Sequence, residues 1–265
     1  MRRNQTLRPE ALMELWQASG LRFKILFTLG MLFIVRFGVA IPIGGLDNAR
    51  LADLFSKGVL QFVDLFAGGA LAKFSIVAMG ILPYINASII MQLMTSAIPK
   101  LEELQKEGGE AGRRQIAQIT RYLTVILATV QAFGMAMFLW RSNIIVAHPA
   151  TGSMPILFLA MVISTLVAGA VLVMWIGEQM TEYGIGNGAS LLIFFGIVAA
   201  IPQYITNTVD YMTNSGEPLV GIKVGFTVLS YLATIVAVVY VTEGARKIPV
   251  QSAKRQVGNR VYGGR

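Results

Sequence analysis

Residues 59–98 read V-L-Q-F-V-D-L-F-A-G-G-A-L-A-K-F-S-I-V-A-M-G-I-L-P-Y-I-N-A-S-I-I-M-Q-L-M-T-S-A-I, an apolar stretch with an interruption near its middle. The first part, up to Ala72, is shorter than the roughly 20 residues that a helix needs to cross the hydrocarbon layer. Gly68 and Gly69 loosen it, and Asp64 and Lys73 add charge. Irregular backbone at membrane depth is tolerated only where protein or a watery cavity surrounds it. The stretch therefore predicts a membrane protein with an interior path.

The composition of the whole chain agrees with this interpretation. Of the 265 residues, 55% are hydrophobic and 14% are charged, and the mean hydropathy is +0.63, as in a polytopic membrane protein. Windows of about 19 residues predict six spans, near residues 25–41, 74–98, 122–140, 154–176, 185–205 and 219–242. Spans three and four carry no charge, and their small side chains predict close helix packing: Ala128, Gly134, Ala136, Ala168, Gly169 and Ala170.

The distribution of basic residues predicts the orientation. An even number of spans places both ends of the chain on one side, and most of the 22 Lys and Arg residues belong to that side. They lie in the segment 1–24, in the loop after the second span and in the segment 243–265. Because cytoplasmic loops carry an excess of Lys and Arg, both termini of this chain are expected in the cytoplasm. Residues 1–24 are charged and polar, unlike a cleavable signal peptide.

Several classes of catalytic or cofactor site are unsupported by the sequence. There is no cysteine, and the single histidine is His148, so a thiolate or histidine metal site is not expected. The glycine-rich run 184–188 follows no strand, which argues against a dinucleotide site. No serine elbow or HExxH helix is present. No enzymatic activity and no cofactor are therefore expected.

Polar residues within the spans leave alternatives open. Arg36 lies near the outer end of the first span, where it can snorkel, form a structural ion pair or act directly in transport. The second span contains Pro83, Asn86, Ser88 and Gln92. Ser88 and Gln92 share one helix face, and Ile81 and Ile85 share another. The polar groups either join neighbouring helices or line a pathway.

The segment after the sixth span is strongly basic. Its Lys and Arg residues either fix topology and touch anionic lipid or dock on a polyanion such as structured RNA or an acidic protein. The segment contains a single acidic residue, Glu243. Its basic residues are Arg246, Lys247, Lys254, Arg255, Arg260 and Arg265.

Six stretches together resemble the SecY family of protein-translocation channel subunits. They are R-F-G-V-A-I-P-I-G-G (36–45), F-A-G-G-A-L-A-K-F-S-I (66–76), G-I-L-P-Y-I-N-A-S-I-I-M-Q-L (80–93), E-G-G-E-A-G-R-R-Q-I-A-Q-I-T-R-Y (107–122), W-I-G-E-Q-M-T-E-Y-G-I-G-N-G (175–188) and I-P-V-Q-S-A-K-R-Q-V-G-N-R-V-Y (248–262). They occur in the family's order across nearly the entire chain. Within the family, the sequence is most similar in character to cyanobacterial or plastid members.

The resemblance implies a SecY-type helical bundle. This chain would supply the first five-span half of an inverted repeat, together with span six. Residues 1–24 would be a cytoplasmic N-terminal segment and residues 25–205 the first half-bundle. Residues 206–242 would form an outer loop and span six, and residues 243–265 a basic cytoplasmic loop. Because family members are longer, the resemblance implies either a fragment or a partner chain that supplies the remainder.

The resemblance also implies roles for particular residues. A hydrophobic pore ring would include Ile81, Ile85, Ala189 and Ile193, with Ala189 smaller than the aliphatic residue usual there. A plug helix over about residues 60–72 would include Phe62, Leu65, Phe66, Gly68 and Gly69. Asn86 and Gln92 would lie toward a lateral gate. Residues that would dock a ribosome or a motor are Arg246, Lys247, Lys254, Arg255 and Arg260.

The implied function is that of the central subunit of a channel for unfolded secretory polypeptides, which also releases membrane segments sideways into lipid. The implied partners are small SecE- and SecG-type membrane subunits, the SecA motor ATPase, the ribosome, signal-bearing polypeptides and membrane lipid. The implied location is the plasma membrane or the thylakoid membrane. A secondary transporter for a small solute is the alternative, although it would need a buried charged cluster at midplane.

Overall fold

The computed structural model describes residues 19–55, 64, 67–145, 156–214, 219–244, 255–257 and 260–262. These residues are helical apart from turns and one short hairpin, as the sequence predicted for an all-α protein. The chain divides into two compact units, Met1–Pro202 and Gln203–Arg265, and each is described by itself.

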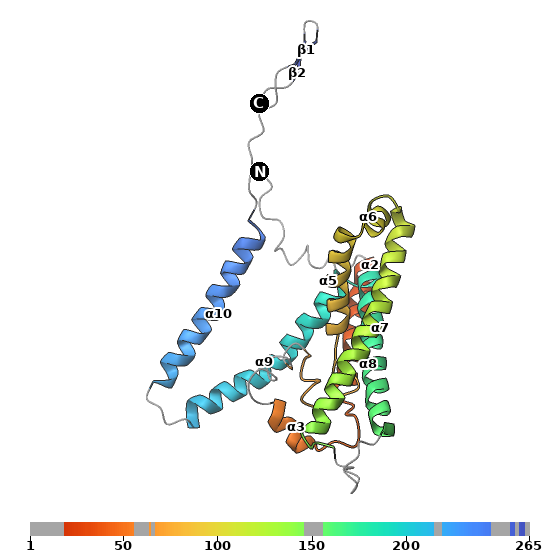
Figure 1. Cartoon of the computed structure of the whole chain (residues 1–265). Helices are drawn as coiled ribbons and strands as arrows, with labels where there is room; N and C mark the ends of the chain where they lie inside the picture. Colours follow the sequence, from red (N-terminus) through yellow and green to blue (C-terminus); the bar gives the residue numbers. More distant parts are fainter. Residues whose placement is uncertain are drawn as a thin grey trace. The chain divides into compact units, whose positions relative to one another are not determined.

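The first unit contains the packed helices. α5 and α7 pack together, α7 also packs on α8, and α2 lies against α8 (Figure 1). The short helix α6 links α5 to α7 and contacts both. The helices of this unit are α2 (Ser19–Val39), α3 (Asn48–Phe55), α5 (Leu82–Ala97), α6 (Pro99–Lys106), α7 (Gly109–Arg141), α8 (Ile156–Tyr183) and the first part of α9 (Gly188–Asn214).

The second unit contains the rest of α9, the helix α10 (Val220–Thr242) and a hairpin of β1 (Arg255–Val257) and β2 (Arg260–Tyr262). The hairpin is antiparallel, with Gln256 paired to Val261. Pro202 lies inside α9, at the boundary between the two units. Proline removes one backbone donor from a helix, so α9 loses a hydrogen bond at this position.

Four helices in the described part of the chain are long and apolar enough to cross a membrane: α7, α8, α9 and α10. They correspond to the predicted spans three to six. The predicted first span is represented by α2, which has 21 residues but carries three basic residues. The predicted second span is represented by α5, which has 16 residues.

The prediction that the second span begins at residue 74 is wrong. Residues 67–81 form successive turns, and the helix starts only at Leu82, with Pro83 in its first turn. Phe74 and Gly80 have φ angles of 43° and 53°, which a right-handed helix excludes. Backbone hydrogen bonds hold this path: the Ile43 N–H donates to the Phe74 carbonyl at 2.9 Å, and the Ile76 N–H donates to the Ile41 carbonyl at 3.0 Å.

The predicted helix over about residues 60–72 is also wrong in its last part. Residues 67–72 are turns, while Phe62, Leu65 and Phe66 lie outside the described residues. The Asp64 carboxylate accepts hydrogen bonds from the N–H groups of Leu71 and Ala72, both at 2.9 Å. A side chain that bonds to backbone in this manner competes with helix formation. The Asp64 side chain thus holds residues 67–72 in a turn conformation.

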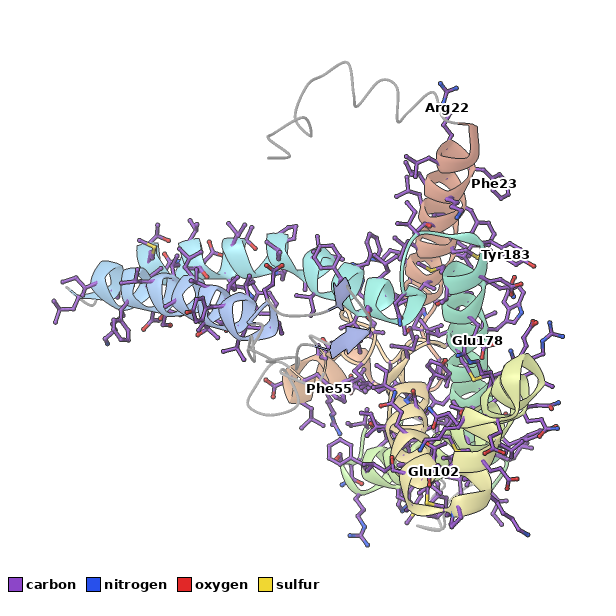
Figure 2. The ribbon with its side chains drawn as sticks, turned by 90° about the horizontal axis from the view of Figure 1, so that it is seen from above. Arg22, Phe23, Phe55, Glu102, Glu178 and Tyr183 are labelled. Atoms are coloured by element: carbon purple, nitrogen blue, oxygen red, sulfur yellow. The ribbon has the colours of Figure 1, made fainter. Side chains whose placement is uncertain are left out.

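Two apolar clusters form the core of the first unit. The first joins the segment 43–55, the turns around Phe74, and the facing sides of α7 and α8. The second joins α2, the turns, α8 and the start of α9, and includes Ile81, Val173, Met180 and Leu192. An aromatic contact lies where Tyr183 of α8 meets α2, with the ring of Phe27 at 6.0 Å, edge to face; Figure 2 labels Tyr183 beside that helix.

Small residues allow the close packing that the sequence predicted, at four of the six positions named. Ala128 and Ala136 of α7 and Gly169 and Ala170 of α8 are buried, whereas Gly134 and Ala168 are exposed. At Gly169 the backbone of the turn segment comes so close that a Cβ atom would overlap the Ile76 carbonyl oxygen. Only glycine fits at this contact.

One ion pair crosses between α7 and α8. The Arg121 Nε donates to the Glu178 Oε1 at 2.8 Å, and the Glu178 side chain is only 19% exposed. Glu178 is labelled on α8 in Figure 2. On α6, labelled at Glu102 in the same view, the hydrogen bond from Lys106 lowers the pKa of the exposed Glu102 carboxyl. The Arg121 side chain is half exposed, and ion pairs open to water contribute little stability, so α7 and α8 owe their contact mainly to the apolar core.

Candidate functional site

A cleft of about 320 Å³ lies between α5, α8 and the start of α9. Its wall combines apolar and polar residues, without any charged side chain among the lining residues. These are Tyr84, Ile85, Ser88, Ile89 and Gln92 from α5, Gly177 and Thr181 from α8, and Asn187, Ala189, Ser190 and Ile193 from the start of α9.

The glycine-rich connection 184–187 forms one end of the cleft. The Asn187 carboxamide oxygen accepts a hydrogen bond from the Ser190 N–H at 3.2 Å and caps α9. The Thr181 hydroxyl accepts from the Gly188 N–H at 2.9 Å, and the Thr28 hydroxyl accepts from the Ile185 N–H at 3.2 Å. α9 therefore begins against α8, and the sequence prediction that this connection is tight and leads into a helix is confirmed.

The structure brings together three of the four predicted ring residues. Ile85, Ala189 and Ile193 line the cleft from two helices. Ile81 lies one turn earlier on the chain, at the N-terminal cap of α5, and is 5% exposed in the second apolar cluster. It lines a separate cavity of about 40 Å³. Ile81 is thus fully within the second apolar cluster, whereas Ile85 packs against the edge of that cluster and also lines the cleft.

The predicted gate residues are separated as well. Gln92 lines the cleft, together with Ser88, one turn before it. Asn86 is exposed and is not among the lining residues. Since the two positions are six apart, they lie about 120° apart around the helix.

Sequence reasoning missed part of the lining. Ile89 follows Ile85 by four residues, so helical spacing alone could have identified it. Gly177 and Thr181 lie on α8, and nothing in their local sequence indicates that α8 meets α5 and α9. Tyr84 was also missed, although it precedes Ser88 by four residues and so shares the face of Ser88 and Gln92.

Arg36 is half-buried near the end of α2, and its guanidinium binds the turn segment. Its Nη1 donates to the Gly68 carbonyl oxygen at 2.7 Å. Among the described residues, Arg36 takes part in no ion pair. Of the alternatives raised by the sequence, a structural ion pair is therefore unsupported within the described part of the chain. Gly68 and Gly69, with φ angles of 65° and 82°, both lie in this turn segment.

The basic C-terminal residues are only partly described. Arg246, Lys247 and Lys254 lie outside the described residues, whereas Arg255 and Arg260 belong to the two strands of the hairpin. The described part of the chain contains no group of His, Cys, Asp or Glu residues arranged to hold a metal ion.

Comparison with known proteins identifies relatives. The SecY family model matches residues 75–265. Protein translocase subunit SecY of Synechococcus elongatus is 47% identical over 258 residues, which are 96% of this chain and 57% of that protein. Protein translocase subunit SecY of Corynebacterium glutamicum is 44% identical over 262 residues, which are 96% of this chain and 58% of that protein. The chain thus spans a little over half the length of these relatives.

Two solved structures share the fold. One is described as the structure of a protein conducting channel, with a TM-score of 0.59 and 18% identity over 82% of this chain and 47% of that chain. The other is Sec61 in the canine ribosome–channel complex from the endoplasmic reticulum, with a TM-score of 0.60 and 19% identity over 89% of this chain and 52% of that chain. With the apolar helices and the sequence identity above, these matches show that the chain is a multi-pass membrane protein that belongs to the SecY family.

Proposed function

We propose that this chain forms one wall of a protein-conducting channel, which passes unfolded secretory polypeptides across a membrane and releases apolar segments sideways into lipid. The observation that carries this proposal is the cleft lined by Ile85, Ala189 and Ile193 in a chain that is 47% identical to a protein translocase subunit. Since the chain covers 57% of that relative, the opposite wall of the pore would come from sequence that this chain does not contain.

The lining of the cleft suits a passing polypeptide. Isoleucine side chains are flexible and apolar, so they contact a moving chain without a fixed hydrogen-bond geometry, and they dewet a narrow gap when no chain is present. The polar groups of Ser88, Gln92, Asn187 and Ser190 offer hydrogen bonds to its backbone. Ala189 adds only a methyl group to this lining. Polypeptides of many sequences would therefore slide along the cleft without binding to it tightly.

A solute transporter is a weaker candidate for the same fold. A transporter that couples solute to an ion places charged or coordinating groups at its binding site near the midplane. The cleft has no charged lining residue. A polypeptide, whose sequence varies along its length, needs no such fixed charge.

The parts of the chain fit the same proposal. Residues 25–205 would be the first half-bundle and residues 206–242 an outer loop with the sixth span. The segment over about residues 60–72 would close the outer side of the pore as a plug. Asn86 and Gln92 would lie on the helix that borders the lateral gate. An open lateral gate would give a signal segment of about 20 apolar residues access to lipid, into which it partitions.

Partners and orientation follow from the same proposal. Both ends of this chain would lie in the cytoplasm, in a plasma or thylakoid membrane, because the Lys and Arg residues gather on that side. SecE- and SecG-type subunits would complete the channel. SecA or a ribosome would drive translocation, since nothing in the sequence resembles a nucleotide-binding loop. The match to Sec61 in a ribosome–channel complex supports the ribosome as a partner.

Cross-linking tests the proposal. The chain has no native cysteine, so Ile85→Cys and Ile193→Cys each introduce one thiol into it. In the complete channel we expect both to cross-link to an arrested secretory polypeptide, because both positions line the cleft. Val130→Cys on α7, 65% exposed and absent from the cleft, is the control. Equal cross-linking at all three positions, or none at Ile85 and Ile193, would contradict the proposed path.

Charge reversal tests the docking role of the basic loop. We expect Arg255→Glu combined with Arg260→Glu to weaken binding of ribosomes or the motor by roughly tenfold or more at moderate salt, because contacts with a polyanion depend strongly on charge. The measurement is co-sedimentation with channel vesicles. Arg50→Glu combined with Arg141→Glu, two exposed positions on the side predicted to be external, carries the same charge change and should bind normally. If the double variant binds normally, the docking role is wrong, and the basic loop serves only to fix the orientation of the chain in the membrane.

A further inference from the structure

Arg36 makes a contact that the proposed pore does not use. It donates from its guanidinium to the Gly68 carbonyl oxygen, across 32 positions of sequence, at 2.7 Å. A hydrogen bond from a charged donor is stronger than a neutral one. The acceptor is a backbone carbonyl in the turn segment, so the contact holds the path of the main chain and not a particular side chain.

The surroundings of Gly68 leave little freedom. Its φ angle is 65°, and a Cβ atom there would lie 2.9 Å from the Cα of Gly196 in α9. Arg36, Gly68 and Gly196 line the cavity of about 40 Å³, which Ile81 and Leu192 also line. That volume is far below the 300–1,000 Å³ usual for small-molecule sites. The junction is therefore suited to a contact between segments and not to a ligand.

The two ends of the turn segment are held differently. Phe74 and Ile76 are bonded through their backbones to Ile43 and Ile41. Residues 67–72, in contrast, bond mainly to Asp64, through its carboxylate and its carbonyl, and to the next residues along the chain, Phe74 and Ser75. Among the described residues, the hydrogen bond from Arg36 is the one that joins residues 67–72 to another element. Residues 67–72 can thus keep their local hydrogen bonds when the contact with Arg36 of α2 is broken.

Apolar burial alone does not fix the loop in place. Ala70 and Leu71 are buried against the core, but the hydrophobic effect has no direction and tolerates sliding. The hydrogen bond from Arg36 to the Gly68 carbonyl is directional, so it fixes the position of the turn segment relative to α2. We propose that Arg36 is a latch that holds residues 67–72 in the closed state, and that its release precedes opening. This inference rests on the proposed function, because it assigns a regulating residue to the same channel.

Thiol accessibility tests the latch. Ala67→Cys places one thiol on the wall of the small cavity, beside Arg36. In the complete channel in sealed vesicles, we expect Arg36→Gln to raise the rate of its modification by a membrane-impermeant maleimide about tenfold, as expected for loss of a hydrogen bond to a charged group. Arg36→Lys, which keeps the charge and a donor, should give an intermediate rate. Equal rates in all three backgrounds would overturn the proposal.

Ala78→Cys is the matched control. Ala78 is fully buried just after the anchored residues Phe74 and Ile76, so its thiol should remain unmodified in every background. If Arg36→Gln exposes position 78 as well, Arg36 stabilises the whole unit, and the latch is refuted.

A second measurement needs no substitution of Arg36. With the native arginine present, an arrested secretory polypeptide should increase modification of Ala67→Cys, because opening releases the loop. No increase would count against the latch. Polypeptide translocation is measured separately in the same vesicles: its failure with a normal thiol response contradicts the proposed function, whereas translocation without any thiol response contradicts the latch alone.

Discussion

Replacing Ile85 and Ile193 with serine in the complete channel is expected to make the resting channel conduct ions, with a flux roughly tenfold or more above that of the parent. An apolar constriction blocks ions because water leaves a narrow gap between isoleucine side chains, and hydroxyl groups restore that water. Both residues line the cleft between α5, α8 and α9 and are only half-buried at the edge of the second apolar cluster, so the substitutions remove no fully buried side chain. Ion flux into channel vesicles without any substrate measures the effect.

The matched control for this experiment is Ile90→Ser on the same helix. Ile90 is 38% exposed and does not line the cleft, so its replacement should leave the flux unchanged. Ile81 requires separate treatment: it is buried, and Ile81→Gly or Ile81→Ser would cost about 2–5 kcal/mol of stability in addition to any leak. An unchanged flux in the Ile85 and Ile193 variants would remove both residues from the proposed ring.

A second large effect is expected at Gly169, where alanine should prevent stable folding of the first unit. The added methyl group would overlap the Ile76 carbonyl oxygen, and a backbone atom has no alternative rotamer to adopt. Overpacking commonly costs about 1–3 kcal/mol and sometimes more, and here either α8 or the turn segment must move. Thermal unfolding in detergent, followed by the loss of helical signal, measures the change.

Gly134→Ala provides the comparison. Gly134 lies within α7, and a Cβ atom there would meet nothing within 4 Å. Because alanine is favoured over glycine in a helix by up to about 1 kcal/mol, this variant should be as stable as the parent or slightly more so. Equal midpoints for the two variants would mean that α8 and the turn segment can separate without cost.

The sequence predicted those parts of the fold that depend on local pattern. Long apolar runs indicated the helices α7 to α10, and the glycine-rich residues 184–188 indicated the start of α9. The turns at 67–81 were not predicted, because F-S-I-V-A-M-G-I is as apolar as a helix. Its path depends on hydrogen bonds with Ile41 and Ile43, and hydrophobicity windows carry no information about such distant partners.

The residues of the candidate site were likewise predicted in part, and the ones that depend on distant contacts were not. Family resemblance placed Ile85, Ala189 and Ile193 together, and the structure brings them to one cleft. It also placed Ile81 with them, because a spacing of four residues implies a shared helix face. The helix starts only after Ile81, so that spacing does not apply, and Ile81 enters the core. The bond between Arg36 and Gly68 had no signal in the sequence, since a backbone acceptor can belong to any residue.

An isolated antiparallel bridge joins Leu46, in the segment after α2, to Ile145, just after α7, and it constrains the order in which the protein is made. These residues pair with each other, and the Asp47 N–H donates to the Ile144 carbonyl at 2.8 Å. At about 5–20 residues per second, Ile145 leaves the site of synthesis roughly 5–20 s after Leu46. Until then the backbone groups of this loop need water or a temporary partner. The loop after α2 can therefore settle only once α7 has been synthesised, so biogenesis of the first helix is completed by the third predicted span.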